Sequence, residues 1–431
     1  MTKSIHLNKA QKESITLLSI GTFLEYFDLM LYVHMAVFLN ELFFPKTDEY
    51  TQSLLTAFAF CSTYLLRPLG ALIFGYLGDK MGRKSTVIIT TIMMSISCFI
   101  MANLPTYAQI GITASWFITL CRIFQGLSSM GEVIGAGIYL TEMVKPPLQN
   151  VAVSSIFIAS TFGGFSALGC ASLINYYGIN WRLAFWIGAI IAIVGIQART
   201  RLRETPEFAN AKKRLEDKLT HLNQDPKLIN TSSIIKMTVP YKTLWAYFFI
   251  ECSWPACFYL KVMYLGTFLV TKFGYSGADV IYHNFQASFF GLIITPIMCW
   301  LSYYIHPLNI LRYIITGFSI IILFLPYILN HIDSPYQVLM LQCCMSLFWP
   351  TAFPANAVFY NHLPVFKRFT YSSVIYAMSR SIMSLVTSVG FVMLINNFGY
   401  IGLYIIFIPI IIGFVFGINH FINLEKEKGL I

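Results

Sequence analysis

The sequence has few charged residues for its length. Of its 431 residues, 11% are Asp, Glu, Lys or Arg, whereas a soluble globular protein has about 25%. A surface facing water needs more charge than this, so a soluble fold is excluded. Hydrophobic residues make up 57% of the chain, which suits a surface that faces lipid. This scarcity of charge predicts an integral membrane protein.

Motifs for metal ligation and for covalent catalysis are also missing. The nine cysteines are scattered through apolar segments, with no CxxC pair and no Cys/His spacing typical of zinc sites. We find no GxSxG motif and no phosphate-binding loop, and the polar loops are too short to hold an active site. We therefore expect no metal, no cofactor and no enzymatic reaction. The formal charge of +10 does not indicate a nucleic-acid partner, because the basic residues lie mostly between apolar runs.

Long apolar runs make up most of the rest of the sequence. A bilayer-spanning helix needs about 20 apolar residues, and about twelve runs reach that length. They lie near residues 14–40, 54–78, 85–104, 111–141, 151–176, 182–199, 243–271, 280–302, 310–330, 336–360, 370–396 and 400–422. We therefore expect an all-α integral membrane fold of about twelve transmembrane helices. Pro350 and Pro354 lie inside the tenth run and predict a kink in that helix.

The first run begins like a signal peptide, because basic residues precede it. However, Glu25 and Asp28 interrupt it, and it continues to about Leu39. The apolar core of a signal peptide has only about 7–15 residues. We therefore expect this run to remain uncleaved as the first transmembrane helix.

A polar segment at residues 200–242 separates two equal sets of runs. We expect a six-helix bundle over residues 1–199, a cytoplasmic linker loop over residues 200–242 and a second six-helix bundle over residues 243–431. Basic residues gather in this loop and in short loops on the same side of the membrane, such as those with Lys80 and Lys145. Because cytoplasmic loops carry an excess of Lys and Arg, we expect a multi-pass protein of the plasma or inner membrane with both termini in the cytoplasm.

Two carboxylates lie where the bilayer makes charge costly. Glu25 and Asp28 fall about eleven to fourteen residues into the first run, which is roughly 16–21 Å along a helix and near the bilayer centre. An ionisable group there costs at least about 2.5 kcal/mol. Their spacing places both on one helix face, and two close carboxylates cannot both ionise cheaply. One is therefore expected to hold a proton near neutral pH, as proton coupling requires; the alternative is structural neutralisation by Arg67 or Arg122.

Other charged residues within the predicted spans are candidates for substrate binding or proton coupling. They are Arg67 in the second span, Arg122 and Glu132 in the fourth, and Arg380 in the eleventh. Arg380 can offer its guanidinium to a substrate carboxylate, or it can snorkel or pair with a carboxylate of the first bundle. Glu251 and Lys261 of the seventh span lie about 15 Å apart along their helix, so they cannot pair with each other.

A short loop between the second and third runs combines glycine with charge. Residues 75–84 read GYLGDKMGRK. The glycines let two helix ends approach and turn within a few residues, and Asp79 can lie at a helix N-terminus or pair with Arg83. Such a clasp can hold one conformation together and open in another. Its residues are Gly75, Asp79, Gly82, Arg83 and Lys84.

This loop resembles the G-x-L-x-D-x-x-G-R-K signature of the major facilitator superfamily. Residues 122–126, RIFQG, resemble the R-x-x-Q-G motif that the superfamily links to proton coupling. Residues 21–28, 131–142, 202–206 and 363–372 are similar to segments of its metabolite:proton symporter branch. Within that branch, the segments are most similar to those of the proline/betaine:proton symporters.

The resemblance extends over nearly the whole chain, and it implies a fold, an activity and roles for particular residues. The fold consists of two six-helix pseudo-symmetric halves. The activity is proton-coupled symport of a small polar solute, either an osmolyte of the proline and glycine betaine type or an organic acid, by alternating access. The residues that would carry coupling or substrate contacts are Glu25, Asp28, Arg122 and Glu132, and Asp79 with Arg83 would form the gating clasp. The implied partners are the solute, protons and the lipid bilayer, and the chain is expected to be monomeric.

The second half departs from the family pattern in one loop. The second copy of the signature, residues 301–307, reads LSYYIHP and has lost its acidic and basic residues. This loss motivates an alternative, a transport-inactive receptor or sensor on the same fold, which would bind solute without pH-coupled uptake. A channel is a further alternative, but the charges cluster at one level of the membrane instead of lining a continuous pore.

Overall fold

The computed structural model describes residues 7–45, 64, 66–200 and 239–430. Over these residues the regular secondary structure is helical, and no strand occurs among them. A helix satisfies its backbone N–H and C=O groups internally, as a lipid environment requires. The all-α prediction is confirmed.

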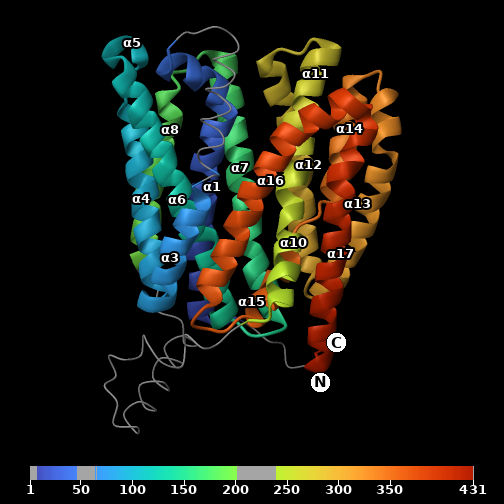
Figure 1. Cartoon of the computed structure of the whole chain (residues 1–431). Coiled ribbons are helices and arrows are strands. Elements are labelled where there is room, and N and C mark those ends of the chain that lie inside the picture. The colour runs from blue at the N-terminus through green and yellow to red at the C-terminus, as the bar shows by residue number, and fades with distance from the viewer. Residues whose placement is uncertain (1–6, 46–63, 65, 201–238, 431) are drawn as a thin grey trace.

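The helices form two bundles that stand side by side (Figure 1). The first bundle contains α1 (Lys9–Phe43), α3 (Arg67–Met81), α4 (Arg83–Asn103), α5 (Tyr107–Ile110), α6 (Ile112–Met143), α7 (Leu148–Tyr177) and α8 (Arg182–Thr200). The second bundle contains α10 (Tyr241–Phe258), α11 (Leu265–Phe273), α12 (Gly277–Leu301), α13 (Pro307–Asn330), α14 (Pro335–Leu347), α15 (Asn356–Asn361), α16 (Arg368–Phe398) and α17 (Leu403–Glu427). The start of α1 and the end of α17 lie on the same side of the molecule, which we call the termini side.

The predicted spans agree closely with these helices. Seven stretches of the described residues are long and apolar enough to cross a membrane, and the last of them, Arg368–Glu427, contains both α16 and α17. The start of the second predicted span, residues 54–63, lies outside the described residues, as does most of the predicted linker loop. The chain is therefore a multi-pass membrane protein of helical type.

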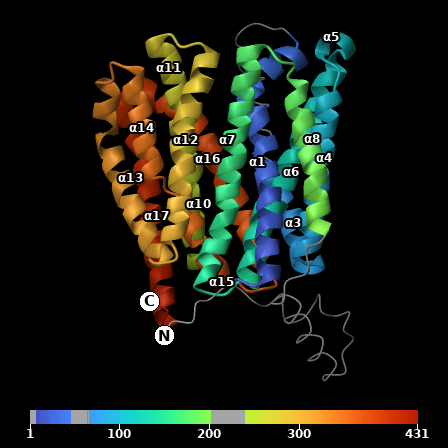
Figure 2. The same cartoon turned by 180° about the vertical axis from the view of Figure 1, so that it is seen from behind.

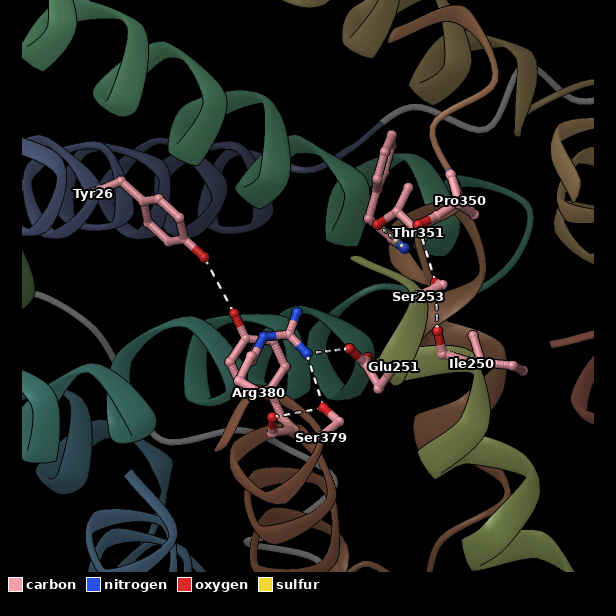
Figure 3. Close-up of polar contacts among 10 residues, drawn as sticks. Tyr26, Ile250, Glu251, Ser253, Pro350, Thr351, Ser379 and Arg380 are labelled. Atoms are coloured by element: carbon pink, nitrogen blue, oxygen red, sulfur yellow. Dashed lines mark hydrogen bonds and ion pairs between the residues drawn. The ribbon is translucent and has the colours of Figure 1, made fainter. Parts of the chain in front are cut away.

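The tenth predicted span breaks where its prolines lie. α14 ends at Leu347, and α15 begins only at Asn356. Pro350 and Pro354 lack the N–H group that a continuous helix would use, so the predicted kink is a full interruption. The Ser253 hydroxyl of α10 donates a hydrogen bond to the Pro350 carbonyl at 3.0 Å (Figure 3). This bond satisfies one backbone group within the interruption.

The seventh span also departs from a regular α-helix. Residues Tyr259–Tyr264 form a π-helical turn between α10 and α11. Pro255 lies four residues before this turn, inside α10. Single π-helical turns are rare, and they occur frequently at functional sites. This one contains Lys261, whose side chain is buried.

The two bundles meet along two pairs of helices. α7 packs against α12, and α16 packs against α3. Figure 2, the view from behind, shows α7 and α12 adjacent to each other. Phe165 of α7 stacks on Phe285 of α12 with ring centroids 4.7 Å apart. A cavity lies between the bundles, lined by residues of both.

Candidate functional site

A cavity of about 210 Å³ lies between the two bundles. Its walls come mainly from α1 and α7 of the first bundle and from α10, α12 and α16 of the second. Most lining residues are apolar or aromatic, and the Asp, Glu, Lys or Arg residues among those described are Glu251, Lys261 and Arg380. The volume suits a small metabolite, because pockets for drug-sized ligands have about 300–1,000 Å³.

Arg380 and Glu251 form an ion pair in the wall of this cavity (Figure 3). Arg380 Nη1 lies 2.7 Å from Glu251 Oε2, and both side chains are buried. The guanidinium also donates to Ser379 Oγ at 3.2 Å and lies 3.3 Å from the centroid of the Tyr376 ring. From the sequence, the possible partners of Arg380 are a substrate carboxylate and a carboxylate of the first bundle. The structure instead gives it a carboxylate of its own bundle.

Two tyrosines join the bundles beside this ion pair. The hydroxyl oxygens of Tyr26 in α1 and Tyr376 in α16 lie 3.2 Å apart, and both residues line the cavity. Figure 3 shows Tyr26 reaching from α1 toward Arg380. Because this contact crosses the interface, any separation of the bundles at this level must break it.

A smaller cavity next to the first one holds two of the predicted charged residues. Glu25 of α1 and Arg67 of α3 both line it, and so do Tyr26 and Tyr376. Because the two tyrosines line both cavities, they form part of the boundary that the cavities share. Glu25 is only 1% exposed, so its carboxylate lies deep within the protein. The structure thus brings Glu25 and Arg67 to one site.

Asp28 and Arg122 belong to a different polar cluster, between α1, α4 and α6. Arg122 Nη1 donates to Gln125 Oε1 at 3.0 Å, and Gln125 Nε2 donates to Cys98 Sγ at 3.4 Å. Asp28 contacts the same thiol, so polar groups connect this carboxylate to the guanidinium. The Arg122 guanidinium also lies 4.0 Å from the centroid of the Tyr32 ring. Neither charged residue is among those that line the two cavities.

Asp28 also packs directly against Gly188 of α8. A Cβ atom at position 188 would collide with Asp28 Oδ1. We predict that Gly188→Ala lowers the free energy of unfolding by about 1–3 kcal/mol, the usual cost of overpacking. Thermal unfolding of the purified protein measures this change. Gly277→Ala is the matched control, because nothing lies within 4 Å of a Cβ atom there. Equal stability of the two variants would contradict the described packing.

On the termini side, the signature segment at residues 75–84 contacts the second bundle; it forms the end of α3, the turn at Gly82 and the start of α4 instead of the predicted loop. Asp79 accepts hydrogen bonds from the backbone N–H groups of Phe369 and Thr370, at 3.2 and 2.8 Å, and from the Thr370 hydroxyl at 2.7 Å. These N–H groups belong to the first turn of α16, so a carboxylate meets the positive end of a helix dipole. The sequence allows two roles for Asp79, and these hydrogen bonds correspond to the one in which it lies at a helix N-terminus.

The glycines of this loop permit the contact. A Cβ atom on Gly75 would lie 2.8 Å from the Cα atom of Thr370, so only glycine allows α3 and α16 to approach this closely. Gly82 has a φ of 101°, which L side chains rarely adopt, and it forms the turn between α3 and α4. Lys84 lies in the first turn of α4 and is partly exposed.

Two more polar contacts cross between the bundles on the termini side. Arg368 Nη1 lies 3.2 Å from Glu142 Oε1, and Asn361 Nδ2 donates to Gln149 Oε1 at 2.9 Å. Together with the bonds of Asp79 to α16, these contacts form the termini-side clasp. Its residues are Asp79, Glu142, Gln149, Asn361, Arg368, Phe369 and Thr370. The clasp joins the two bundles on this side of the cavity.

The second copy of the loop, residues 301–307, is tied into its own bundle. His306 precedes α13, and its Nε2 atom lies 3.7 Å from Glu425 Oε2 of α17. His362 Nε2 lies 2.6 Å from the other oxygen of the same carboxylate. The loop that has lost its acidic and basic signature residues therefore contributes a histidine to a contact within the second bundle.

Three residues that line the cavity are not among the predicted site residues, namely Tyr26, Glu251 and Lys261. Glu251 and Lys261 carried a signal, because each is a charge inside an apolar run. Tyr26 lies between two predicted carboxylates but gave no separate signal, since aromatic residues are common in membrane helices. Two predicted site residues, Arg83 and Glu132, have side chains outside the described part of the structure, and their roles stay predictions.

Comparison with known proteins identifies relatives of the sequence. The family model described as Major Facilitator Superfamily matches residues 18–388. The proline/betaine transporters of Salmonella typhimurium and Escherichia coli K12 are each 30% identical over 298 residues, which are 68% of this chain and 59% of the relative. The match therefore spans less than two thirds of the length of these relatives. The glycine betaine/proline/ectoine/pipecolic acid transporter OusA of Dickeya dadantii is 34% identical over 212 residues, which are 48% of this chain and 42% of OusA.

Solved structures share the fold. The proton:xylose symporter XylE has a TM-score of 0.73 at 14% identity, covering 98% of this chain and 96% of XylE. The human organic anion transporter MFSD10 has a TM-score of 0.66 at 12% identity, covering 96% of this chain and 99% of MFSD10. At these identities, the likeness is one of architecture.

Proposed function

Because the chain belongs to the major facilitator superfamily, a family of membrane transporters and not of enzymes, we propose that it is a proton-coupled symporter. Its solute is small, polar and organic, of the proline and glycine betaine type or an organic acid. The bundles, residues 1–199 and 243–431, move against each other about the central cavity, and the loop at 200–242 links them. The named substrates of the relatives support the solute class, and the cavity between the two bundles supports a carrier.

The observation that carries this proposal is the position of Glu25. Its buried carboxylate lines a small cavity, and Tyr26 and Tyr376 separate this cavity from the central one and contact each other across the bundle interface. A carboxylate in the membrane interior is costly when ionised. Its protonation can therefore be coupled to the closing of the bundles around a solute.

Protonation of Glu25, Asp28 or Glu132 together with solute binding permits this closure. Enclosing a charged carboxylate without the proton would cost at least about 2.5 kcal/mol. Arg67 lines the small cavity together with Glu25, and Arg122 is connected to Asp28 only indirectly, through Gln125 and Cys98. Closing would alternate between the termini side, where the clasp lies, and the opposite side.

The membrane orientation follows from the distribution of basic residues. On the termini side, Lys80 lies in the last turn of α3, and Lys145 and Lys367 lie between helices; the sequence of residues 200–242 is also rich in basic residues. We therefore assign the termini side to the cytoplasm and the protein to the plasma or inner membrane. One chain encloses the cavity between its own bundles, so the functional unit proposed is the monomer.

Uptake into proteoliposomes tests the proposed function. We expect one solute of a panel of proline, glycine betaine, 2-oxoglutarate, citrate and shikimate to accumulate under an inward proton gradient, and an uncoupler to abolish its accumulation. Glu25→Gln and Asp28→Asn should lower accumulation to background while leaving solute exchange. Unchanged proton-driven accumulation in both variants would rule out these carboxylates. Lack of uptake of any solute, beside an active reconstituted relative, would favour the receptor alternative.

A further inference from the structure

Among the described residues that line the central cavity, one positive charge is not balanced by the others. One acidic and two basic side chains belong to this described lining, so its formal charge is +1 with histidine neutral. Arg380 and Glu251 neutralise each other in their ion pair. Lys261 Nζ instead donates to the Ser346 hydroxyl and lies 5.1 Å from the centroid of the Trp349 ring. Among the described residues, no carboxylate forms an ion pair with Lys261.

The fold holds Lys261 in this position. The backbone carbonyl of Lys261, within the π-helical turn, accepts a hydrogen bond from Gln342 Nε2 of α14 at 2.7 Å. Gln342 also donates to Asn284 Oδ1 of α12 at 3.2 Å, so the turn is tied to two neighbouring helices. The side chain is buried against the cavity instead of extending to the membrane surface, as an anchoring lysine does. A charged residue supported in this way inside the membrane indicates a binding role.

Several aromatic rings that line the cavity already contact cationic side chains of the protein. The Arg380 guanidinium lies 3.3 Å from the centroid of Tyr376 and 5.4 Å from that of Trp254. Lys261 in turn faces Trp349. Quaternary ammonium ligands bind to such ring faces. Here a cationic solute would have to displace Arg380 or Lys261 from the rings, and it would be repelled by their positive charge. The cavity therefore disfavours a solute with a cationic group.

We propose that Lys261 binds the carboxylate of the transported solute, and that this solute is a small monocarboxylate. This inference rests on the transport function proposed above and adds the binding residue and the chemical class. The Lys261 ammonium has several N–H donors, and one of them bonds to the Ser346 hydroxyl. The remaining N–H groups can form charge-assisted hydrogen bonds to a carboxylate. One carboxylate cancels the formal charge of the described lining, whereas a second would lack a counter-charge there at low dielectric.

Binding to the purified full-length chain in lipid nanodiscs tests this inference. Tryptophan fluorescence reports on the site, because Trp254 and Trp349 line the cavity. The probes are shikimate, lactate and cyclohexanecarboxylate, each compared with its neutral methyl ester or amide, and also glycine betaine and 2-oxoglutarate. We expect at least one monocarboxylate to bind at least about tenfold more tightly than its neutral counterpart, glycine betaine or 2-oxoglutarate, as loss of a charge-assisted hydrogen bond implies.

Substitutions of Lys261 test whether this residue causes the preference for monocarboxylates. Lys261→Gln should weaken monocarboxylate binding at least about tenfold, and Lys261→Arg should recover part of the loss. Lys272→Gln is the matched control, because this exposed lysine lies at the end of the same span and outside the cavity. Monodisperse size-exclusion profiles confirm folding of each variant.

Three outcomes would overturn the inference: no carboxylate binds, glycine betaine or 2-oxoglutarate binds as tightly as every monocarboxylate, or Lys261→Gln binds like the wild type. Uptake of the bound probe is measured separately. Carboxylate binding that depends on Lys261 but is followed by no uptake would contradict the proposed transport function and leave the binding assignment standing.

Discussion

Arg380→Gln should destabilise the protein by about 3–5 kcal/mol, because it leaves the carboxylate of Glu251 buried without its partner. The Arg380 and Glu251 side chains are only 5% and 3% exposed, so little water reaches the pair. Thermal unfolding in detergent, followed by loss of the monodisperse size-exclusion peak, measures the change. The wall of the cavity depends on this pair, so solute binding should fall with the stability.

The double variant Glu251→Gln with Arg380→Gln separates lost charge from lost contact. It should be considerably more stable than Arg380→Gln alone, since neither site then holds a buried charge without a partner. Arg312→Gln serves as the control, because the Arg312 side chain is exposed and donates a hydrogen bond to the uncharged Asn419 Oδ1. Arg380→Gln with the stability of this control would show that the buried pair is not what the structure describes.

Asp79→Ala should shift the bundles toward a state that is open on the termini side. The substitution removes three hydrogen bonds to Phe369 and Thr370. Even one charge-assisted bond, at about 1.5–3 kcal/mol, changes the ratio of two conformations by roughly tenfold to a hundredfold. Electron–electron double resonance between nitroxides at positions 80 and 426, in a background without native cysteines, measures the separation of the bundles.

We expect a longer distance population to appear in Asp79→Ala and not in Asp279→Ala. Asp279 is a comparable control, because its carboxylate also accepts hydrogen bonds at a helix N-terminus, from Ser276, but within one bundle. An unchanged distance distribution in Asp79→Ala would mean that the remaining contacts of the clasp hold the termini side closed without this carboxylate.

The architecture was predictable because it depends on local composition. The length of each apolar run fixed the helix positions, and the prolines at 350 and 354 marked the interruption of the tenth span. The glycines of residues 75–84 likewise predicted a tight turn between two helices. These features follow from a few neighbouring residues, so one sequence is enough to infer them.

The partners of the charged residues were not predictable in the same way. Arg380 and Glu251 are 129 positions apart, and their pairing depends on how α16 packs against α10. The π-helical turn at Lys261 has no local sequence signature, and its tie to Gln342 bridges 81 positions. The spacing of Glu25 and Asp28 predicted a shared face, but not that they would meet different helices of the first bundle. Long-range packing therefore decides which charges form the site.

The most direct test of the account is whether solute moves protons. Proteoliposomes with the wild-type chain and a pH-sensitive dye in the lumen receive the transported solute outside, with no imposed gradient. The account predicts that the lumen acidifies as solute enters and that Asp28→Asn abolishes this acidification while still exchanging solute. Solute entry without any change of lumen pH would contradict proton-coupled symport.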